Sequence, residues 1–475
     1  MTPFIGRQIE LNGLKGLLEK KSASLVVIKG RRRIGKSRLA EEFGQSFSQC
    51  FLFEGLPPTT GTTSDHQKKE FLRQMKEYRI PFFGSEDWGD IFTDLAKYVQ
   101  KGKILIVLDE ISWLGLKDPT FLGKLKTAWD QHFKKNPHLV MILSGSQSTW
   151  IEKNILRNSG FVGRISYQLT LGELSLAECN QFWGSKKDSI SPYEKLKILS
   201  ITGGVPRYLE EVLPHLSAEE NIRRLCFQPE GFLFHEFEQI FSDLFSKRSE
   251  NYRMIVERLA EDDAMMEDIV KRLGRSKGGD IGQYLDDLCQ TGFVTRDHTW
   301  SIKDAQPSKL SRYRLSDNYS RFYLKYISPN RHKIETGLVD VLPPSWLSVI
   351  GLQFENLVLN KKNRLQLFNH LGIPHQEILL SNPFFQTKTK QHGGCQVDLM
   401  IQTKFKTLYL CEIKFKGNPI DSDIIQEVKQ KIKRLQIPRN FSVRPVLIHV
   451  NGVNDSIIAS DFFSHIVDFG EMLSD

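Results

Sequence analysis

A glycine-rich segment near the N-terminus has the residue types and spacing of a phosphate-binding loop. The run GRRRIGKS, residues 30–37, matches the pattern G-x-x-x-x-G-K-[ST] at every fixed position. Gly30 and Gly35 permit backbone angles that turn successive N–H groups toward phosphate oxygens. Lys36 is expected to reach the β and γ phosphates, and the Ser37 hydroxyl to ligate Mg²⁺. The segment therefore predicts a site for ATP and magnesium.

An acidic pair further along the chain supplies the second half of this chemistry. Asp109 and Glu110 directly follow the apolar run Ile104 to Leu108. In such a pair the first carboxylate holds Mg²⁺ through water, and the second polarises the attacking water. Asp109 is therefore a predicted metal ligand, and Glu110 a predicted catalytic residue together with Lys36.

The next apolar run, His138 to Gln147, ends in polar residues. In ATPases of this type the strand beside the acidic pair carries a polar side chain that senses the γ-phosphate. Ser146 or Gln147 is a candidate for this role, and Ser146 is the one we assign to the nucleotide. A simple turn at the end of a strand is the alternative.

A third chemical set lies near the C-terminus. Glu355 falls in a helical pattern, Asp398 in the strand-like run GGCQVDLMIQ, and Glu412 and Lys414 in the run KTLYLCEIKFKG. Residues two apart on a strand project from one face, so Glu412 and Lys414 point the same way. Asp398 and Glu412 together suit Mg²⁺, with Glu355 extending the shell, and Lys414 would position a metal-activated water. Gln426 on a following helix completes the set.

These residues need a scaffold that alternates strands and helices. The β-branched run SLVVIKG leads into the phosphate loop and SRLAEEFGQSF follows it as a helix. Strands alternating with helices predict an α/β fold with a mainly parallel sheet and helices on both faces.

Length and composition limit the remaining alternatives. The chain has 475 residues, which suggests several domains, and an ordinary soluble composition with 40% apolar residues. No apolar run is long enough for a membrane span, and no secretion signal is evident. The six scattered cysteines favour reduced thiols in the cytoplasm over disulfides or zinc. The net charge of +9 permits a nucleic-acid partner, although a solvated lysine-rich surface is as good an explanation.

Beyond these motifs, the N-terminal half resembles the archaeal-type ATPase family, a branch of the AAA+/STAND P-loop ATPases. The resemblance rests on three stretches, "FIGRQIELNGL", "NSGFVGRIS" and "TGGVPRYLEEV", whose matching residues are Phe4, Gly6, Arg7, Glu10, Leu11, Gly163, Arg164, Gly203, Gly204, Pro206 and Tyr208. It implies an ATPase core followed by a helical lid. A homo-oligomer is a further partner that it allows.

The resemblance also implies roles for individual arginines. It places Arg7 near the adenine, and we assign Arg38 to the nucleotide site as well. Arg164 would act on the γ-phosphate as a sensor in cis or a finger in trans. Bracing the lid on the core is an equally good explanation for Arg164 and Arg207.

The C-terminal set resembles the PD-(D/E)xK restriction-endonuclease-like nucleases. The order of Glu355, Asp398, Glu412-x-Lys414 and Gln426 matches that group, although Val397 stands where the group's name has proline. The resemblance implies metal-dependent cleavage of DNA. The aromatic segment Arg314 to Ile334 is similar to an uncharacterised C-terminal domain that often accompanies these ATPases.

The middle of the chain predicts a winged helix-turn-helix. Three short helical patterns from about Glu250 are followed by a two-stranded pattern that ends near Leu315. Lys271, Arg272, Arg275 and Lys277 are candidate DNA contacts. Because the third helix is acidic, we favour a rigidifying or protein-binding role over sequence-specific reading.

The sequence therefore predicts four domains: an ATPase core at 1–165, a helical lid at 166–245, a winged helix at 246–335 and a nuclease-like domain at 336–475. The leading hypothesis is an ATPase whose nucleotide state gates a DNA nuclease. A nucleotide-switched scaffold that binds nucleic acid without cutting it is the alternative, and a helicase-like motor ranks last.

Overall fold

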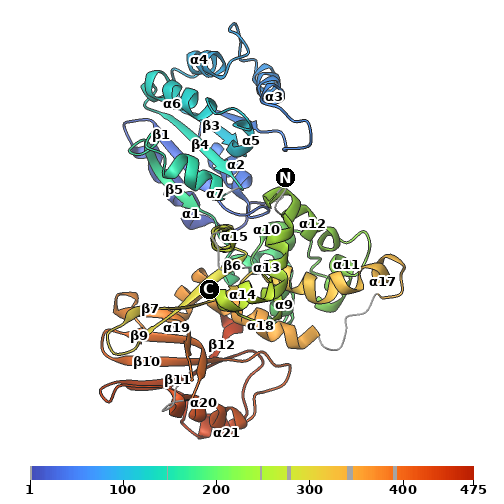
Figure 1. Cartoon of the computed structure of the whole chain (residues 1–475), viewed down its shortest axis with the longest axis vertical. Coiled ribbons are helices and arrows are strands. Elements are labelled where there is room, and N and C mark those ends of the chain that lie inside the picture. The colour runs from blue at the N-terminus through green and yellow to red at the C-terminus, as the bar shows by residue number, and fades with distance from the viewer. Residues whose placement is uncertain are drawn as a thin grey trace. The chain divides into compact units, whose positions relative to one another are not determined.

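The chain forms two compact units. The computed structural model describes residues 3–146, 148–245, 249–274, 280–339, 346–388 and 393–474. Unit 1 comprises Met1–Gly172 with Ser242–Ser246, and unit 2 comprises Glu173–Phe241 with Lys247–Asp475 (Figure 1). Each unit has its own sheet and its own hydrophobic core.

Unit 1 is built on a parallel sheet with the strand order β2-β3-β4-β1-β5. The strands are β1 (Ser24–Lys29), β2 (Gln49–Glu54), β3 (Ile104–Asp109), β4 (Leu139–Gly145) and β5 (Ile165–Thr170). Every residue of β3 and β4 is buried, as expected for central parallel strands covered on both faces. The α/β fold class and the parallel sheet predicted from the sequence are confirmed.

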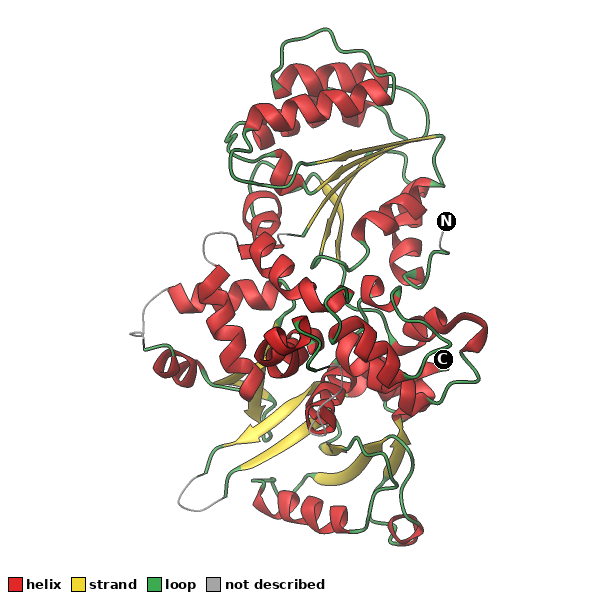
Figure 2. Ribbon diagram, turned by 90° about the vertical axis from the view of Figure 1, so that its right-hand side faces the viewer, coloured by secondary structure: helices red, strands yellow, loops and turns green. Residues whose placement is uncertain are grey.

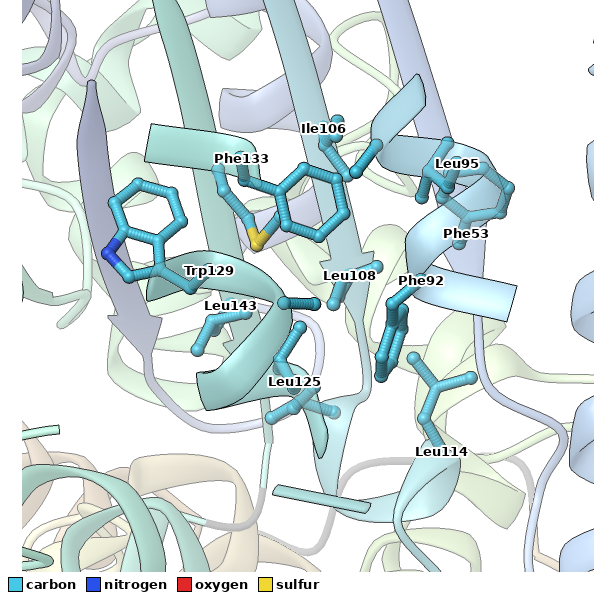
Figure 3. Packing of buried hydrophobic residues seen from close by; sticks show 14 of the residues in the cluster. Phe53, Phe92, Leu95, Ile106, Leu108, Leu114, Leu125, Trp129, Phe133 and Leu143 are labelled. Carbon is cyan, nitrogen blue, oxygen red and sulfur yellow. The ribbon is translucent and has the colours of Figure 1, made fainter. Parts of the chain in front are cut away.

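Helices cover both faces of this sheet, as Figure 2 shows. They are α1 (Gln8–Lys15), α2 (Lys36–Gly44), α3 (Ser64–Glu77), α4 (Trp88–Tyr98), α5 (Ile111–Leu114), α6 (Phe121–Gln131) and α7 (Ser148–Ile151). Alternate residues of one strand enter different cores, because successive side chains of a strand point to opposite faces. Val26 packs with α1 and α2, whereas Leu25 joins the core under α3, α4 and α6 that Figure 3 shows.

Unit 2 contains a mixed sheet with the order β12-β11-β10-β9-β8. Its strands are β8 (Ile378–Gln386), β9 (Cys395–Thr403), β10 (Thr407–Ile413), β11 (Ser442–His449) and β12 (His465–Asp468), of which β8, β9 and β10 pair antiparallel and the rest parallel. The flanking helices are α18 (Trp346–Leu359), α19 (Lys361–His370), α20 (Asp423–Arg434) and α21 (Asp455–Ala459).

The predicted winged-helix segment also belongs to unit 2. It contains α13 (Ser249–Glu261), α14 (Met266–Arg272), α15 (Asp280–Gln290) and the hairpin of β6 (Val294–Ser301) and β7 (Gln306–Leu315), with Ala264 bridging to Tyr313. Lys271 and Arg272 end α14. Arg275 and Lys277 lie outside the described residues. Classification as a winged helix and contact with DNA stay predictions.

Four helices that follow Gly172 share a core with the C-terminal sheet: α8 (Leu176–Asn180), α9 (Pro192–Thr202), α10 (Pro206–Leu209) and α11 (Ala218–Cys226). The next helix, α12 (Phe232–Phe245), belongs to unit 2 up to Phe241 and to unit 1 from Ser242. Two short helices, α16 (Asn318–Phe322) and α17 (Arg331–Glu335), come later in unit 2. One cluster joins Leu196 and Leu199 of α9 to Phe354 of α18 and Cys411 of β10. Of the segment 166–245 that was predicted as a separate lid, residues 173–241 thus lie in the same compact unit as the C-terminal sheet. Residues 166–172 and 242–245 belong to unit 1, because β5 pairs with β1 in the first sheet.

Candidate functional site

The phosphate loop joins β1 to α2 in unit 1, in the order strand, loop, helix that the motif requires. Gly35 has φ 89° at the position directly before α2, a left-handed conformation that favours glycine. A Cβ atom on Gly30 would lie 2.6 Å from the Leu171 carbonyl oxygen. Both fixed glycines of the motif are therefore required by the backbone, and the N-terminus of α2 opens onto the loop, as anion binding demands.

Lys36 lies inside this loop. Its ammonium donates to the carbonyl oxygens of Gly30 at 3.1 Å and Arg31 at 3.2 Å. Burial lowers the pKa of Lys36, and the negative charges of Glu110 and Asp109 partly oppose that shift. The ammonium is thus held by neutral carbonyls beside two carboxylates, a position from which it is available to a phosphate.

Ser37 and the first acid of the pair meet directly. The Ser37 hydroxyl donates to Oδ2 of Asp109 at 2.5 Å, and Ser144 of β4 donates to Oδ1 at 2.5 Å. Magnesium is held in nucleotide sites by one or two carboxylates together with phosphates and waters. A hydroxyl and a carboxylate at this spacing fit that ion, so Ser37 and Asp109 would hold it.

Glu110 is held by the end of β4. It adopts a left-handed backbone (φ 47°), and its Oε2 accepts hydrogen bonds from Ser146 N at 3.0 Å and Ser146 Oγ at 2.9 Å. The two predicted residues thus contact each other through Oε2 of Glu110, and its second carboxylate oxygen, Oε1, takes no part in this contact. Gln147, the other candidate sensor, lies outside the described residues.

Arg7 lies beneath the loop and is buried. Its Nη2 donates to Ile34 O at 3.0 Å and to Gly172 O at 2.6 Å. The guanidinium therefore clamps the backbone of the phosphate loop, whereas contact with the adenine stays a prediction. Arg38 pairs with Glu41 of its own helix at 3.2 Å, and its predicted role with the nucleotide is likewise untested.

Arg164 is braced inside unit 1. Its guanidinium donates to both carboxylate oxygens of Asp130 on α6, with its closest contact at 2.8 Å. Hydrogen bonds from Arg164, and then from Lys126, lower the pKa of Asp130. This contact joins two residues of the ATPase core and does not reach the segment predicted as the lid, so the bracing of the lid and the catalytic role of Arg164 both stay predictions.

The C-terminal residues gather on the face of the second sheet that α20 covers. Asp398 lies on β9 and Glu412 on β10, one step beyond the paired Leu399 and Cys411. Oδ2 of Asp398 accepts from Ile413 N at 2.9 Å. Lys414 lies 3.0 Å from Glu412, which is buried to 1% side-chain exposure. The structure thus brings together Asp398, Glu412 and Lys414 as predicted.

A second lysine reaches the same carboxylates and was not predicted. The ammonium of Lys431 on α20 lies 2.6 Å from Oε2 of Glu412 and 3.6 Å from Oδ1 of Asp398. Lys431 follows the buried Val428 by three residues, so it falls on the apolar face of its helix, and that spacing was the available signal. Gln426, which the sequence placed in the set, is exposed.

Burial and repulsion from a neighbouring carboxylate raise the pKa values of two acids in this region. The pKa of Asp398 is raised to about 6, first by burial and then by Glu412, while Lys431 opposes the shift. The pKa of Glu355 on α18 is raised to about 8, mainly by burial and then by Asp398, against the attraction of Arg314. Perturbed carboxyls of this kind are typical of functional sites.

The three predicted C-terminal metal ligands do not group as one cluster. Across the described ranges, no three His, Cys, Asp or Glu side chains lie close enough to hold a metal ion together. Lysine ammonium groups instead lie at both carboxylate oxygens of Glu412, and Asp398 has Lys431 near Oδ1 and the N–H of Ile413 at Oδ2. Glu355 comes from a helix whose neighbours pack in a different core cluster from α20. The geometry therefore does not support a three-carboxylate shell that includes Glu355. Asp398 and Glu412 still fit Mg²⁺, since one or two carboxylates with phosphates and waters suffice.

Comparison with known proteins defines the class of the N-terminal part. Residues 4–212 match the model of a family described as an ATPase domain predominantly from Archaea. The match includes the phosphate loop, the acidic pair and the helices α8, α9 and α10 of unit 2. The chain thus contains a P-loop ATPase domain.

The chain is also similar to individual proteins. The chain is 28% identical over 426 residues to an uncharacterized protein of Methanocaldococcus jannaschii, covering 87% of this chain and 88% of that one. It is similar to the Walker-type ATPase of Pyrococcus abyssi at 17% identity and TM-score 0.49, over 68% of this chain and 96% of that one. The ORC2 protein of Aeropyrum pernix aligns at 16% identity and TM-score 0.40, over 70% and 92%.

The sequence predicted no membrane-spanning segment, and the helices of the structure can be compared with this prediction. Within the described part of the chain, no helix is both long and apolar enough to cross a membrane.

Proposed function

We propose that the chain is a magnesium-dependent ATPase whose nucleotide state controls a metal-dependent phosphodiesterase site in unit 2. The observation that carries the second half is the pairing of Asp398 and Glu412 with two lysines, Lys414 and Lys431, on one face of a sheet. We propose a polynucleotide as the substrate of this site, and DNA as the first one to test.

In unit 1 the chain's own groups divide the work of hydrolysis. Backbone N–H groups of residues 30–37 and the ammonium of Lys36 bind the phosphates, while Ser37 and Asp109 would hold the metal. When bound, that ion would supply positive charge at the transferred phosphoryl group. Ser146 holds Oε2 of Glu110, and Oε1 would orient the attacking water.

In unit 2 the same logic applies to a phosphodiester. Asp398 and Glu412 would hold the metal, which would supply Lewis-acid activation of a water. Lys414 and Lys431 would stabilise the charge that develops on the phosphate. Burial of Glu412 keeps water from screening these charges.

Control of one site by the other is supported by the shared core of unit 2. The family match to the ATPase domain ends at residue 212 and so includes α9. The ring of Tyr193 at the start of α9 stacks on Phe415, one residue after Lys414, with centroids 5.1 Å apart. Motion of α9 would therefore displace the strand end that carries Lys414.

Hydrolysis of ATP tests the first half. We expect purified chain to release phosphate from ATP with Mg²⁺, and Lys36→Ala and Glu110→Gln to lower kcat by at least about 100-fold. Glu110→Gln should retain ATP binding, because Glu110 contacts Ser146 and not the loop. Equal turnover by wild type and Glu110→Gln would refute this assignment.

Cleavage of polynucleotide tests the second half. Wild type is expected to cut plasmid DNA with Mg²⁺ or Mn²⁺, and Asp398→Ala to lose this activity. Gln430→Ala serves as the matched control on α20, because that side chain is exposed. ATP hydrolysis with no cutting of DNA or RNA would favour the alternative, a nucleotide-switched scaffold whose C-terminal part only binds nucleic acid.

A further inference from the structure

A cavity of about 940 Å³ lies in unit 2 between the β6–β7 hairpin and the C-terminal sheet. Its walls are the hairpin at 299–310, the end of β8 at 384–387 and the chain after α20 at 435–438. We call this the hairpin groove. Neither the proposed ATPase chemistry nor the proposed cleavage uses it.

The wall formed by the hairpin is fixed to the sheet. Nε1 of Trp300 donates to Oε1 of Gln402 at 2.6 Å, and Nε2 of Gln402 donates to the Ile302 carbonyl at 2.9 Å. Thr299 Oγ1 donates to the Phe385 carbonyl at 2.9 Å. All three donors are on buried residues. The hairpin is therefore committed to β8 and β9, and the groove is pre-formed.

The charge around the groove suits a polyanion. The segments 299–310, 384–388 and 433–439 contain one acidic residue, Asp304, and six basic residues, all exposed: Lys303, Lys309, Lys388, Lys433, Arg434 and Arg439. No carboxylate is among the lining side chains. The lining mixes hydroxyls and amides with apolar side chains such as Leu310 and Ile437, which suits phosphates, base edges and base faces together.

The groove also lies next to the proposed phosphodiesterase site on the same sheet. Phe384, Phe385 and Gln386 of the groove pair with Val397, Gln396 and Cys395 of β9, and Asp398 is the next residue of that strand. On the other wall, Lys431 lies one helical turn before Leu435 of the groove. A strand lying in the groove would thus lead toward Asp398.

We propose that the hairpin groove binds a single-stranded polynucleotide, DNA or RNA, that flanks the bond to be cut. This rests on the proposed cleavage function. A single strand is favoured over a duplex because the hairpin, held by Trp300 and Gln402, does not project from the sheet to enter a duplex groove.

Fluorescence anisotropy with the full-length protein in EDTA tests the groove without any cleavage. The probes are labelled single-stranded oligothymidylate, its RNA counterpart and a labelled duplex. The double variant Lys303→Glu/Lys309→Glu removes positive charge at the rim, and Ser301→Trp fills the groove without changing charge. The matched control is Lys76→Glu/Lys101→Glu, which makes the same charge change on exposed residues of unit 1.

We expect the rim variant to weaken single-strand binding about tenfold at about 0.1 M salt, and to lower the salt slope by about 1.4, since each lost phosphate contact accounts for about 0.7. Ser301→Trp should weaken binding without changing that slope, and the control should bind like wild type. Unequal loss on the DNA and RNA probes identifies the preferred strand.

Binding unchanged by both groove variants, or equal loss in the unit 1 control, would overturn the proposal, as would loss confined to the duplex probe. The outcome is separate from the cleavage assay. If wild type never cuts but the groove variants lose binding, the proposal of a binding groove is supported and the proposal of a nuclease is refuted. If Asp398→Ala abolishes cutting while the groove variants bind normally, the proposal of a nuclease is supported and the proposal of a binding groove is refuted.

Discussion

At the scale of single residues, the phosphate loop is held by charged side chains that donate hydrogen bonds to its backbone carbonyls. Lys36 bonds the carbonyls of Gly30 and Arg31 from inside the loop, and Arg7 bonds the carbonyl of Ile34 from beneath it. The loop carbonyls are thereby satisfied by cations, which leaves its N–H groups for an anion.

Removing the lower clamp tests this account. Arg7→Ala leaves the buried carbonyls of Ile34 and Gly172 without their donor, which costs about 2 kcal/mol. The melting temperature of unit 1 should fall by about 4–8 °C, and ATP affinity should fall with it. Arg38→Ala, whose ion pair with Glu41 is partly exposed, should change stability by less than about 0.5 kcal/mol. Equal effects of the two variants would contradict a clamp.

The raised pKa of Glu355 predicts a pH dependence of stability. The pKa is about 8 in the folded protein against 4.5 as the reference, so the folded state holds the proton more tightly. The protonated carboxyl therefore stabilises the folded state fully at pH values below about 4.5. This stabilisation is lost as the pH rises through about 8. Glu355→Gln should therefore stabilise the protein relative to wild type at pH 9, by more than about 1 kcal/mol.

Thermal unfolding at pH 4, 6 and 9 measures this difference. The gain from Glu355→Gln should grow steadily with pH, and Glu335→Gln at an exposed position should show no such trend. A constant difference between Glu355→Gln and wild type across the three values would contradict the shift.

Secondary-structure elements show where sequence reasoning succeeds and where it fails. Buried strands such as β3 and β4 are continuous apolar runs, and the residues at their ends follow from local order, so the phosphate loop, Asp109 and Ser146 were placed correctly on the fold. Asp398, Glu412 and Lys414 were found because alternation along a strand is a local pattern. The contacts of Lys431 with Glu412, of Arg7 with Gly172 and of α9 with the C-terminal sheet join distant segments, which no local periodicity encodes.

The exposed edge of the first sheet depends on one helix. Tyr78, which follows α3, bonds both the N–H and the carbonyl of Leu52 on β2, and Gln74 of α3 does the same for Glu54. An unpaired strand edge recruits other strands, so these two side chains protect β2.

Gln74→Ala/Tyr78→Phe should make the protein aggregate at lower concentration and temperature than wild type, because the N–H and carbonyl groups of β2 lose their partners. Light scattering during a slow thermal ramp measures this. Gln45→Ala, which removes a surface hydrogen bond to Glu42, is the control. Unchanged scattering by the double variant would show that the edge needs no such cover.

At the scale of the whole molecule, the proposed control of cleavage by ATP runs through α9. Eight of its residues are buried, and its N-terminal turn packs against Phe415 and near Gly417 and Gly470. A helix so enclosed moves as a rigid body with its neighbours, because packed interiors deform little.

Tyr193→Ala should uncouple the two sites while leaving each intact. We expect the ratio of cleavage rates with and without ATP to fall at least about fivefold toward one, the lower end of typical coupling. ATP hydrolysis should persist. Phe405→Ala, at an exposed position on the β9–β10 turn, should keep the wild-type ratio. Loss of ATP hydrolysis in Tyr193→Ala would point instead to a folding defect.

The most direct test of two magnesium sites under one control is cleavage of plasmid and single-stranded DNA with Mg²⁺ and with ATP, ADP or no nucleotide. Wild type should cut at a rate that depends on the nucleotide. Lys36→Ala should cut at one rate in all three conditions, and Asp398→Ala should not cut yet still hydrolyse ATP. Cutting by wild type that ignores the nucleotide, or that survives in Asp398→Ala, would contradict the account.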